Sequence, residues 1–400
     1  MTSIKPYKIN ISPSSLERLM QKLALADFPD QDDLEKDSWT KGPPVGEIKR
    51  LVNAWQTVYN WRDVEARLNQ LPQFMTPIDI SDFGAFDIHF VHKKSTKADA
   101  IPLLFLHGWP GSFYEVARII DPLVQGDDKA GPTFHVVAPS LIDFGFSSPS
   151  KVYDKLMQTL GYHHYVIQGG DAGGLISRYM AKLFGPSRCL AHHTNTPLPS
   201  QPTEETHPDL HAQSLTTPLT EIEQRGLVRA AAFDKEGSGY YKLQSTKPMT
   251  IGYSLRDSPV GLLAWIYEKL HDWSDDYFWT DEEILTWVSI YYFCTPGPDA
   301  SSKVYYTFEH CDPPAFAAAG AYMEVPLGIS RFLNDLILLP KSWNQTLGPI
   351  VYQAEHEKGG HFAAWEVPGT IVEDLRLMFS TAGIGLQIEE QLQAAYFRDN

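Results

Sequence analysis

The stretch of sequence that decides the fold is residues 165–174, Tyr-Val-Ile-Gln-Gly-Gly-Asp-Ala-Gly-Gly. Its first four residues form an apolar run of the kind found in buried strands, and residues 175–180 repeat apolar positions at helical spacing. Between these two segments, four glycines surround Asp171. We therefore predict a strand, a sharp turn and a helix, with Asp171 at the apex of the turn.

The glycine spacing is typical of a nucleophile elbow in which Asp171 stands where G-x-S-x-G hydrolases carry serine. The strained turn accepts only small residues two positions before and two positions after the nucleophile, here Gly169 and Gly173. The dipole of the following helix favours an ionised carboxylate. The sequence contains no G-x-S-x-G, and no Lys-Ser or Lys-Thr follows the turn, which excludes an ordinary serine esterase and a Walker-type phosphate loop. A glycine-rich turn with a helix-capping aspartate is the alternative interpretation.

An aspartate nucleophile narrows the class of substrate. A carboxylate can attack an electrophilic sp³ carbon to form an ester, and a second attack at the ester carbonyl then releases the product. Epoxides and haloalkanes are the obvious electrophiles for this chemistry.

The catalytic partners are expected downstream, in the order nucleophile, acid, histidine. A strand predicted at residues 350–354 leads into Gly-Gly-His361, and the two glycines suit a loop that holds the imidazole over the elbow. Asp335 lies 26 residues before His361. We expect His361 to act as general base on water and Asp335 to orient it. Glu324 is the alternative acid, and a surface helix aspartate is the alternative interpretation of Asp335.

Two histidines in the same loop raise the question of a metal site. His356 and His361 are five residues apart with two glycines between them, whereas H-E-x-x-H zinc sites place their histidines four apart on a helix. We therefore expect no metal and no cofactor. In this interpretation His356 is outside the catalytic set, and Glu357 is its exposed neighbour.

An oxyanion site is expected upstream, where residues 104–112 read as a strand followed by a tight turn. The backbone N–H groups of Trp109 and Ala172 would face the developing oxyanion, and losing one such donor costs about 3–4 kcal/mol in hydrolases. His107 precedes this turn. We interpret His107 as structural, because its position suits packing and hydrogen bonding to loop backbone better than proton transfer.

The chain is organised around residues 101–197, where apolar strand-like runs alternate with helical patterns as in a parallel sheet with crossover helices. Helices and then strand-like segments precede this region, and a block of helices rich in Trp and Tyr follows it. The strand pattern resumes at residues 322–325. We predict an N-terminal extension over residues 1–95, an α/β core over 96–197 and 316–400, and a helical cap over 198–315.

Composition limits the partners. The 400 residues include 33 Lys and Arg against 49 Asp and Glu, a net charge of −16, which disfavours nucleic acid or an anionic membrane surface as partner. The longest apolar stretch, residues 315–323, is far below the roughly 20 residues of a membrane span. No secretory signal is legible, and three scattered cysteines fit a reducing compartment. We expect a cytoplasmic protein with a small-molecule substrate.

Three stretches together resemble the microsomal-type epoxide hydrolases, including soluble fungal members. They are residues 107–113 (His-Gly-Trp-Pro-Gly-Ser-Phe), 169–174 (Gly-Gly-Asp-Ala-Gly-Gly) and 359–362 (Gly-Gly-His-Phe). The stretch 61–65 (Trp-Arg-Asp-Val-Glu) extends the resemblance over nearly the whole chain. The sequence lacks the membrane anchor with which mammalian microsomal relatives begin, which favours the soluble branch.

The resemblance implies both a fold and an activity. The implied fold is an α/β-hydrolase core with a mostly parallel sheet, a helical cap inserted after strand 6, and an N-terminal extension of helices and a hairpin. The implied activity is that of a cofactor-independent epoxide hydrolase, which converts an epoxide and water to a vicinal diol through a covalent aspartyl ester.

The resemblance further implies two cap tyrosines that hold and protonate the epoxide oxygen. The segment 236–248 resembles the segment of the first tyrosine, and counting back from its Ser-Thr-Lys-Pro end selects Tyr240 over Tyr241. The segment that begins at Ser301 resembles the second, and its spacing favours Tyr306 over Tyr305. The family's basic residue and Glu after that position are replaced here by Thr and Phe, so the choice between the two tyrosines stays open.

Other functions remain in view. A haloalkane dehalogenase shares the Asp nucleophile but usually needs a halide-binding Trp directly after it, where this chain has Ala172. A biosynthetic relative that opens a tethered epoxide with an internal hydroxyl would carry the same motifs, as would a catalytically inactive binding protein on the same fold. The sequence does not determine which epoxide is the substrate. It also leaves open whether the protein forms a homodimer.

Overall fold

A mixed nine-stranded sheet organises the computed structural model, which describes residues 4–30, 36–80, 84–126, 131–142 and 147–399. Its strands lie in the order β1-β2-β3-β5-β4-β6-β7-β8-β9. The strands are β1 (Lys5–Pro6), β2 (Gln73–Ile80), β3 (Gly84–Lys93), β4 (Ile101–Leu106), β5 (Phe134–Pro139), β6 (Tyr165–Gly169), β7 (Cys189–Thr194), β8 (Leu327–Phe332) and β9 (Ile350–His356). The pairs β1–β2, β2–β3 and β3–β5 are antiparallel, and every pair from β5 across to β9 is parallel. The mostly parallel sheet is therefore as expected, and the N-terminal hairpin β2–β3 continues it.

The register of the central strands explains where a site can form. The last residues of neighbouring strands lie opposite one another, with Leu106 of β4 paired to Gly169 of β6 and Gly169 to Thr194 of β7. Ligands of open α/β sheets bind beyond the carboxyl ends of such strands. The predicted turn after β6 stands at this edge.

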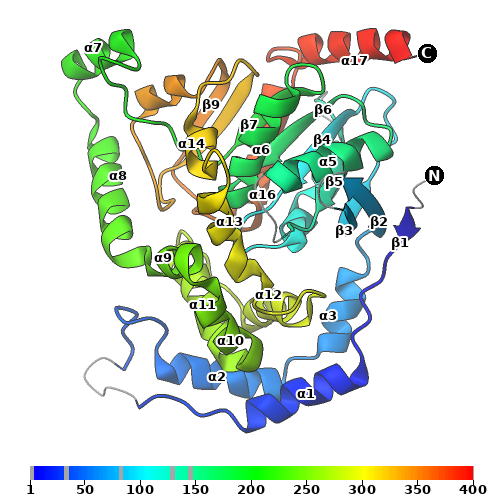
Figure 1. Cartoon of the computed structure of the whole chain (residues 1–400), viewed down its shortest axis with the longest axis vertical. Helices are drawn as coiled ribbons and strands as arrows, with labels where there is room; N and C mark the ends of the chain where they lie inside the picture. The colour runs from blue at the N-terminus through cyan, green and yellow to red at the C-terminus, as the bar shows by residue number, and fades with distance from the viewer. Residues whose placement is uncertain (1–3, 31–35, 81–83, 127–130, 143–146, 400) are drawn as a thin grey trace.

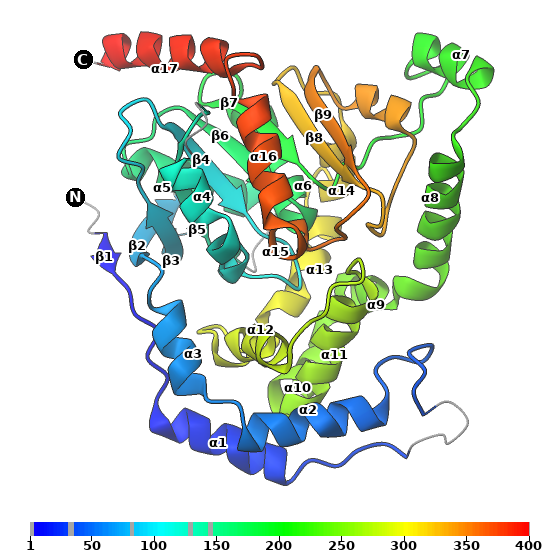
Figure 2. The same cartoon turned by 180° about the vertical axis from the view of Figure 1, so that it is seen from behind.

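Helices cover both faces of the sheet (Figures 1 and 2). On one face pack α5 (Ser147–Thr159), α6 (Asp171–Phe184) and α14 (Ala315–Gly320); on the other lie η2 (Phe113–Arg118), α4 (Ile120–Gln125), α15 (Ala363–Glu366), α16 (Pro368–Met378) and α17 (Gly385–Asp399). Each face buries its own apolar cluster, one that includes Leu156 and Met180, the other Leu123 and Ile371. Strands buried on both faces account for the continuous apolar runs in the sequence.

The helical insertion begins after β7, the sixth strand of the chain if the two-residue β1 is left out. It consists of α7 (Pro208–Thr216), α8 (Glu221–Ala232), η3 (Phe233–Gly237), α9 (Gly239–Thr246), α10 (Pro248–Asp257), α11 (Pro259–Asp272), α12 (Asp281–Phe293), η4 (Ala300–Lys303), α13 (Val304–His310) and α14. Figure 1 shows α10, α11 and α12 between the sheet and the N-terminal helices. We refer to this insertion as the cap.

The N-terminal helices α1 (Pro13–Ala24), α2 (Val45–Thr57) and α3 (Trp61–Leu68) pack against the cap. Ser12 caps α1 through its side chain, and Pro13 follows at the first helical position, as predicted for a helix start. Leu23 and Trp55 are buried in the same apolar cluster as Leu263 of α11. The N-terminal segment thus joins the sheet through its hairpin and covers the cap with its helices.

The strand predicted at residues 322–325 is wrong. The structure places β8 at Leu327–Phe332, beyond Pro326, and residues 322–325 precede it outside any strand. All six residues of β8 are buried, including Ser330 and Arg331. Their polar side chains concealed the strand from a search for apolar runs. The 3₁₀ helix η5 (Lys341–Thr346) connects β8 to β9.

Candidate active site

Asp171 stands at the apex of the predicted turn. It is the first residue of α6 and has a φ of +48°, the left-handed conformation expected of a nucleophile elbow. The turn passes close to β4, so that a Cβ on Gly173 would lie 2.1 Å from the carbonyl oxygen of Leu106. A glycine is therefore required two positions after Asp171, as the sequence predicted.

The turn after β4 faces the Asp171 carboxylate. The backbone N–H of Trp109 donates a hydrogen bond of 2.8 Å to Asp171 Oδ1. Ala172 lies in the first turn of α6, where helix N–H groups have no acceptor within the helix. The structure thus places both predicted oxyanion residues, Trp109 and Ala172, beside the aspartate.

The cap holds this turn in place. On α12, the indole N–H of Trp287 donates to the carbonyl of Pro110, and the hydroxyl of Tyr291 donates to the carbonyl of Gly111. The indole N–H of Trp109 donates to Ser301 Oγ at 3.2 Å. The position of the Trp109 amide therefore depends on the core and the cap together.

His361 lies between two carboxylates. Its Nε2 is 3.6 Å from Asp171 Oδ2, and its Nδ1 is 2.9 Å from Asp335 Oδ1. Asp335 follows β8 and accepts the backbone N–H of Leu336 through the same oxygen at 2.7 Å. Glu324, the alternative acid, is exposed and lies before β8. The structure therefore brings Asp335 to the histidine.

The charge state of His361 follows from these neighbours. Burial opposes the charged imidazolium, but the carboxylates of Asp335 and Asp171 outweigh it and raise the pKa of His361 well above its usual 6.5. The two carboxyl groups therefore favour the imidazolium form of His361.

Tyr240 of α9 and Tyr305 of α13 lie together above the nucleophile. Both are buried, their ring centroids are 5.7 Å apart, and the Tyr240 ring stacks on Trp109 at 5.0 Å. Burial first, and the Asp171 charge second, raise the pKa of both phenols, while the approach of the Tyr305 hydroxyl lowers that of Tyr240. The Tyr305 hydroxyl makes no hydrogen bond of ordinary geometry to any residue that the structure describes. A buried hydroxyl without a partner beside a nucleophile suits a donor to substrate.

The predicted second tyrosine, Tyr306, is wrong. Its side chain is 41% exposed, and its ring stacks on His310 at 4.0 Å instead of reaching the site. Tyr305, one residue earlier, occupies the place expected of Tyr306. The signal was present in the sequence, because Tyr305 and Phe308 are three apart and share the buried face of α13.

Sequence reasoning missed one acidic residue of the site, Glu115 of η2. It lines a small cavity together with Asp171, His361 and the oxyanion turn, and a Cβ on Gly111 would lie 1.6 Å from its Oε1. Burial raises the pKa of Glu115 to about 8; the imidazolium of His361 and backbone N–H groups oppose the rise, while the charge of Asp171 adds to it. The cavity offers about 20 Å³ for the centre of a water molecule, room for one.

Two other histidines have structural partners. His107 lies within hydrogen-bonding distance of the Gly108 carbonyl through Nδ1 (2.9 Å) and accepts the Leu141 N–H at Nε2 (3.0 Å), and burial lowers its pKa to about 4. His356 pairs with the buried Asp374 at 2.6 Å. The geometry agrees with the interpretation of His107 as structural, and His356 lies outside the Asp171 site.

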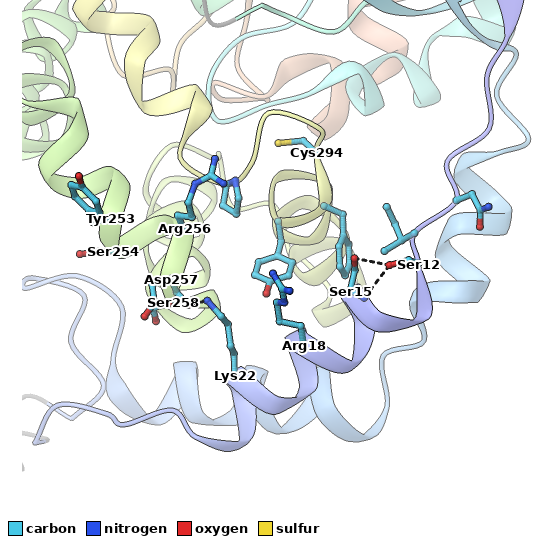
Figure 3. A pocket seen from close by; sticks show the side chains of 15 residues that line it. Ser12, Ser15, Arg18, Lys22, Tyr253, Ser254, Arg256, Asp257, Ser258 and Cys294 are labelled. Atoms are coloured by element: carbon cyan, nitrogen blue, oxygen red, sulfur yellow. Dashed lines mark hydrogen bonds and ion pairs between the residues drawn. The ribbon is translucent and has the colours of Figure 1, made fainter.

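A larger groove of about 1090 Å³ lies between α1 and the cap helices α10 and α12 (Figure 3). Two of its cations are engaged in ion pairs: Lys22 pairs with Asp257 of the same groove at 3.0 Å, and Arg256 pairs with Asp299 outside it at 2.6 Å. None of its lining residues lines the cavity beside Asp171. By volume alone this groove would be the candidate active site. We choose the smaller cavity because Asp171, His361 and the turn after β4 converge there.

Comparisons with known proteins agree with the geometry. Residues 4–116 match the family model described as "Epoxide hydrolase N terminus", and residues 101–227 match the "alpha/beta hydrolase fold". The chain is 31% identical to epoxide hydrolase 1 of Sus scrofa over 94% of this chain and 88% of the relative. The Aspergillus niger epoxide hydrolase structure is 31% identical with a TM-score of 0.79, covering 93% of this chain and 95% of that one. The juvenile hormone epoxide hydrolase of Bombyx mori is 26% identical with a TM-score of 0.84, covering 94% and 93%.

Among the helices that the structure describes, none combines the length and the apolar character needed to cross a bilayer.

Proposed function

The chain belongs to the microsomal-type epoxide hydrolase family and is an epoxide hydrolase with an α/β-hydrolase fold, and from this premise we propose a two-step mechanism carried by Asp171. In the first step the epoxide ring opens and an ester forms on Asp171. In the second step water cleaves that ester and a vicinal diol leaves. The mechanism needs no cofactor.

In ring opening, a carboxylate oxygen of Asp171 attacks one epoxide carbon, and the bond from that carbon to the epoxide oxygen breaks. An unassisted opening would expel an alkoxide whose conjugate acid has a pKa near that of water, so a proton donor is required. Tyr240 and Tyr305 supply hydrogen bonds to this oxygen, and Tyr240 gives it a proton. Two phenols on one oxygen also orient the ring toward the nucleophile.

The ester step begins with a change in charge at His361. Esterification removes the negative charge of Asp171, one of the two carboxylates that keep the pKa of His361 high. The imidazolium then gives its proton back to the Tyr240 phenolate that ring opening left, so Tyr240 is again a neutral phenol. The neutral imidazole accepts a proton from the attacking water, while Asp335 continues to orient Nδ1. The N–H groups of Trp109 and Ala172 stabilise the tetrahedral oxyanion.

The water for this step is proposed to occupy the small cavity beside Asp171. Glu115 and His361 both line it, so one molecule can bond to the base and to a second polar group. With a pKa of about 8, Glu115 is largely protonated at neutral pH and adds no further anion to the site. It can therefore hold water without repelling the oxyanion.

The observation that carries the proposal is the position of Asp171. Its two oxygens face the Trp109 amide at 2.8 Å and the His361 Nε2 at 3.6 Å, and its charge is felt by both buried phenols. A capping aspartate would need none of these neighbours. A nucleophile that becomes an ester needs all of them.

A single turnover with excess enzyme in ¹⁸O water and styrene oxide tests the mechanism. We expect the first diol to carry no label and the Asp171 peptide to carry it, because the diol oxygen comes from the carboxylate. Label in the first diol would mean direct attack by water and would remove Asp171 as nucleophile.

A further inference from the structure

A lysine with almost no exposed surface lies beside the proposed proton donor. Lys269 of α11 is 2% exposed, and its Nζ lies 4.9 Å from the ring centroid of Tyr240. The rings of Trp265 and Trp273 are 5.6 and 5.8 Å from the same nitrogen. A buried ammonium is costly unless it is compensated, so a charge in this position calls for an explanation.

The Lys269 ammonium has a carboxylate partner, and aromatic rings lie on its other sides. The Lys269 ammonium pairs with the carboxylate of Glu268, the preceding residue, whose side chain is 29% exposed. Three aromatic rings, Tyr240 among them, cover other approaches to the ammonium. A cation over an aromatic face is attracted by the quadrupole of the ring, so the three rings help to hold the ammonium in place.

We infer that Lys269 is a positioning residue for ring opening, whose ammonium makes the Tyr240 phenol a better proton donor to the epoxide oxygen. The inference rests on the proposed role of Tyr240. The proton passes from the Tyr240 hydroxyl to the epoxide oxygen as the carbon–oxygen bond breaks, and Lys269 keeps its own protons throughout.

The effect arises from a difference between ground state and transition state. A neutral phenol ring attracts a cation only through its quadrupole. As the proton leaves, negative charge develops on the phenol, and its attraction to Lys269 increases. Only interactions that strengthen in this way accelerate a reaction.

The need for such a cation follows from the rest of the site. Burial and the charge of Asp171 both raise the pKa of Tyr240, which would make it a weak acid at the moment of reaction. The Tyr305 hydroxyl opposes this shift from one side. Lys269 is the ammonium that lies against the ring itself.

A purely structural function is the competing explanation, since the Lys269–Glu268 pair could simply stabilise the cap. The two explanations differ for Glu268. Glu268→Gln removes the ion pair but leaves the Lys269 ammonium at Tyr240. If the ion pair only stabilises the cap, this substitution should weaken the cap as Lys269→Met does; if Lys269 acts on Tyr240, the acidity of the phenol should be unchanged.

Stopped-flow mixing of the full-length enzyme with excess styrene oxide separates the two steps. Tryptophan fluorescence follows ester formation and decay because Trp109 and Trp273 border the site, and quenched samples give the ester by mass spectrometry. For Lys269→Met we expect ring opening to slow about tenfold and ester hydrolysis to change less than twofold. Lys269→Arg should restore most of the rate, and Glu268→Gln should open the ring as fast as wild type.

A double-mutant cycle gives the decisive comparison. In a Tyr240→Phe background, Lys269→Met should add no further slowing of ring opening, because it acts through the missing hydroxyl. Lys247→Met, at an exposed position of the cap, serves as the matched control and should match wild type. Lys269→Gln gives the same readout should methionine lower the melting temperature of the cap.

Equal slowing of both steps by Lys269→Met and Glu268→Gln, or additive effects with Tyr240→Phe, would overturn the inference in favour of a tether. An unchanged ring-opening rate in Lys269→Met and Lys269→Gln would overturn it as well. Failure of the proposed function is distinguishable, because the wild-type enzyme would then form no ester on Asp171.

Discussion

At the scale of residues, one position on α13 decides which tyrosine hydroxyl is buried beside Tyr240, the place proposed for the epoxide oxygen. Tyr305 and Tyr306 are neighbours in sequence, but successive helical residues point about 100° apart, so only one of them can face Tyr240. The 3₁₀ turn η4 directly before α13 changes the phase of the helix, which counting from Ser301 does not capture. The spacing in the sequence was enough to identify the segment that begins at Ser301. The burial of Tyr305 in the structure was needed to identify the residue.

The two tyrosines therefore make a matched pair of variants. We expect Tyr305→Phe to slow ring opening about 10²-fold, because one of the two donors to the epoxide oxygen is lost. Tyr306→Phe should keep the wild-type rate, since its exposed ring stacks on His310 outside the site. Single-turnover ester formation measures both. Equal effects of the two substitutions would contradict the assignment of Tyr305.

The raised pKa of Glu115 predicts how the free energy of unfolding depends on pH. Its folded-state pKa of about 8 lies above the ordinary 4.5, so between these values the unfolded chain releases a proton that the folded chain retains. The unfolded state then binds fewer protons, and the free energy of unfolding falls as pH rises, by up to about 4 kcal/mol between pH 5 and 8. Glu115→Gln removes this dependence, so its stability relative to wild type should increase across that range. Urea unfolding at several pH values measures the difference.

The exposed Glu357→Gln is the control for this measurement and should run parallel to wild type at every pH. A Glu115→Gln curve that is also parallel to wild type would mean that Glu115 ionises normally. The proposed neutral carboxyl beside the water cavity would then be wrong.

At the scale of elements, the elbow could be predicted because its determinants are local. Four glycines around one aspartate, a preceding apolar run and a following helix lie within a few residues of one another. The strand β8 could not be found in the same way. The buried side chains of Ser330 and Arg331 are satisfied by partners that include Asp374 of α16 and Glu355 of β9. Partners so distant in sequence leave no local signal.

Glu115 was missed for a similar reason. Its position in the sequence after the oxyanion turn resembles an ordinary first-turn acid of a short helix. Only the fold brings its carboxyl to the cavity that Asp171 and His361 also line. Chain order was enough to predict Asp171, Asp335 and His361 as the proposed nucleophile, acid and base, whereas the position of Glu115 at the small cavity depends on three-dimensional packing.

The elbow also makes a prediction about element packing. Gly173→Ala should lower the free energy of unfolding by about 3 kcal/mol, because the new methyl group would lie 2.1 Å from the Leu106 carbonyl and force α6 away from β4. Gly369→Ala in α16, where nothing lies within 4 Å, is the control and should be neutral or slightly stabilising. Denaturant unfolding compares them, and equal stabilities would show that the elbow tolerates a side chain.

At the scale of the whole molecule, the site is assembled from three layers. The sheet contributes Asp171 and the turn after β4, the cap contributes the tyrosines and Lys269, and the N-terminal helices cover the cap from outside. Trp55 of α2 is fully buried in the cluster that contains Leu263 and Ile266 of α11, the helix of Lys269. Among its described residues, the N-terminal segment thus supports the site through the cap and places none in the cavity beside Asp171.

Truncating Trp55 tests this arrangement. Trp55→Ala should cost about 3–5 kcal/mol, because a large buried side chain leaves a cavity under the cap. We expect the destabilisation to appear first in the cap. Amides of α11 and α12 should lose hydrogen-exchange protection before those of β4 and β6, which pack against the core helices. Ring opening should slow more than ester hydrolysis, since Tyr240 and Lys269 belong to the cap, whereas His361 and Asp335 follow strands of the sheet.

Val58→Ala, at a position 81% exposed on the same segment, is the control and should leave hydrogen exchange and kinetics unchanged. Uniform loss of protection over sheet and cap would show instead that the N-terminal helices stabilise the whole molecule as one cooperative unit.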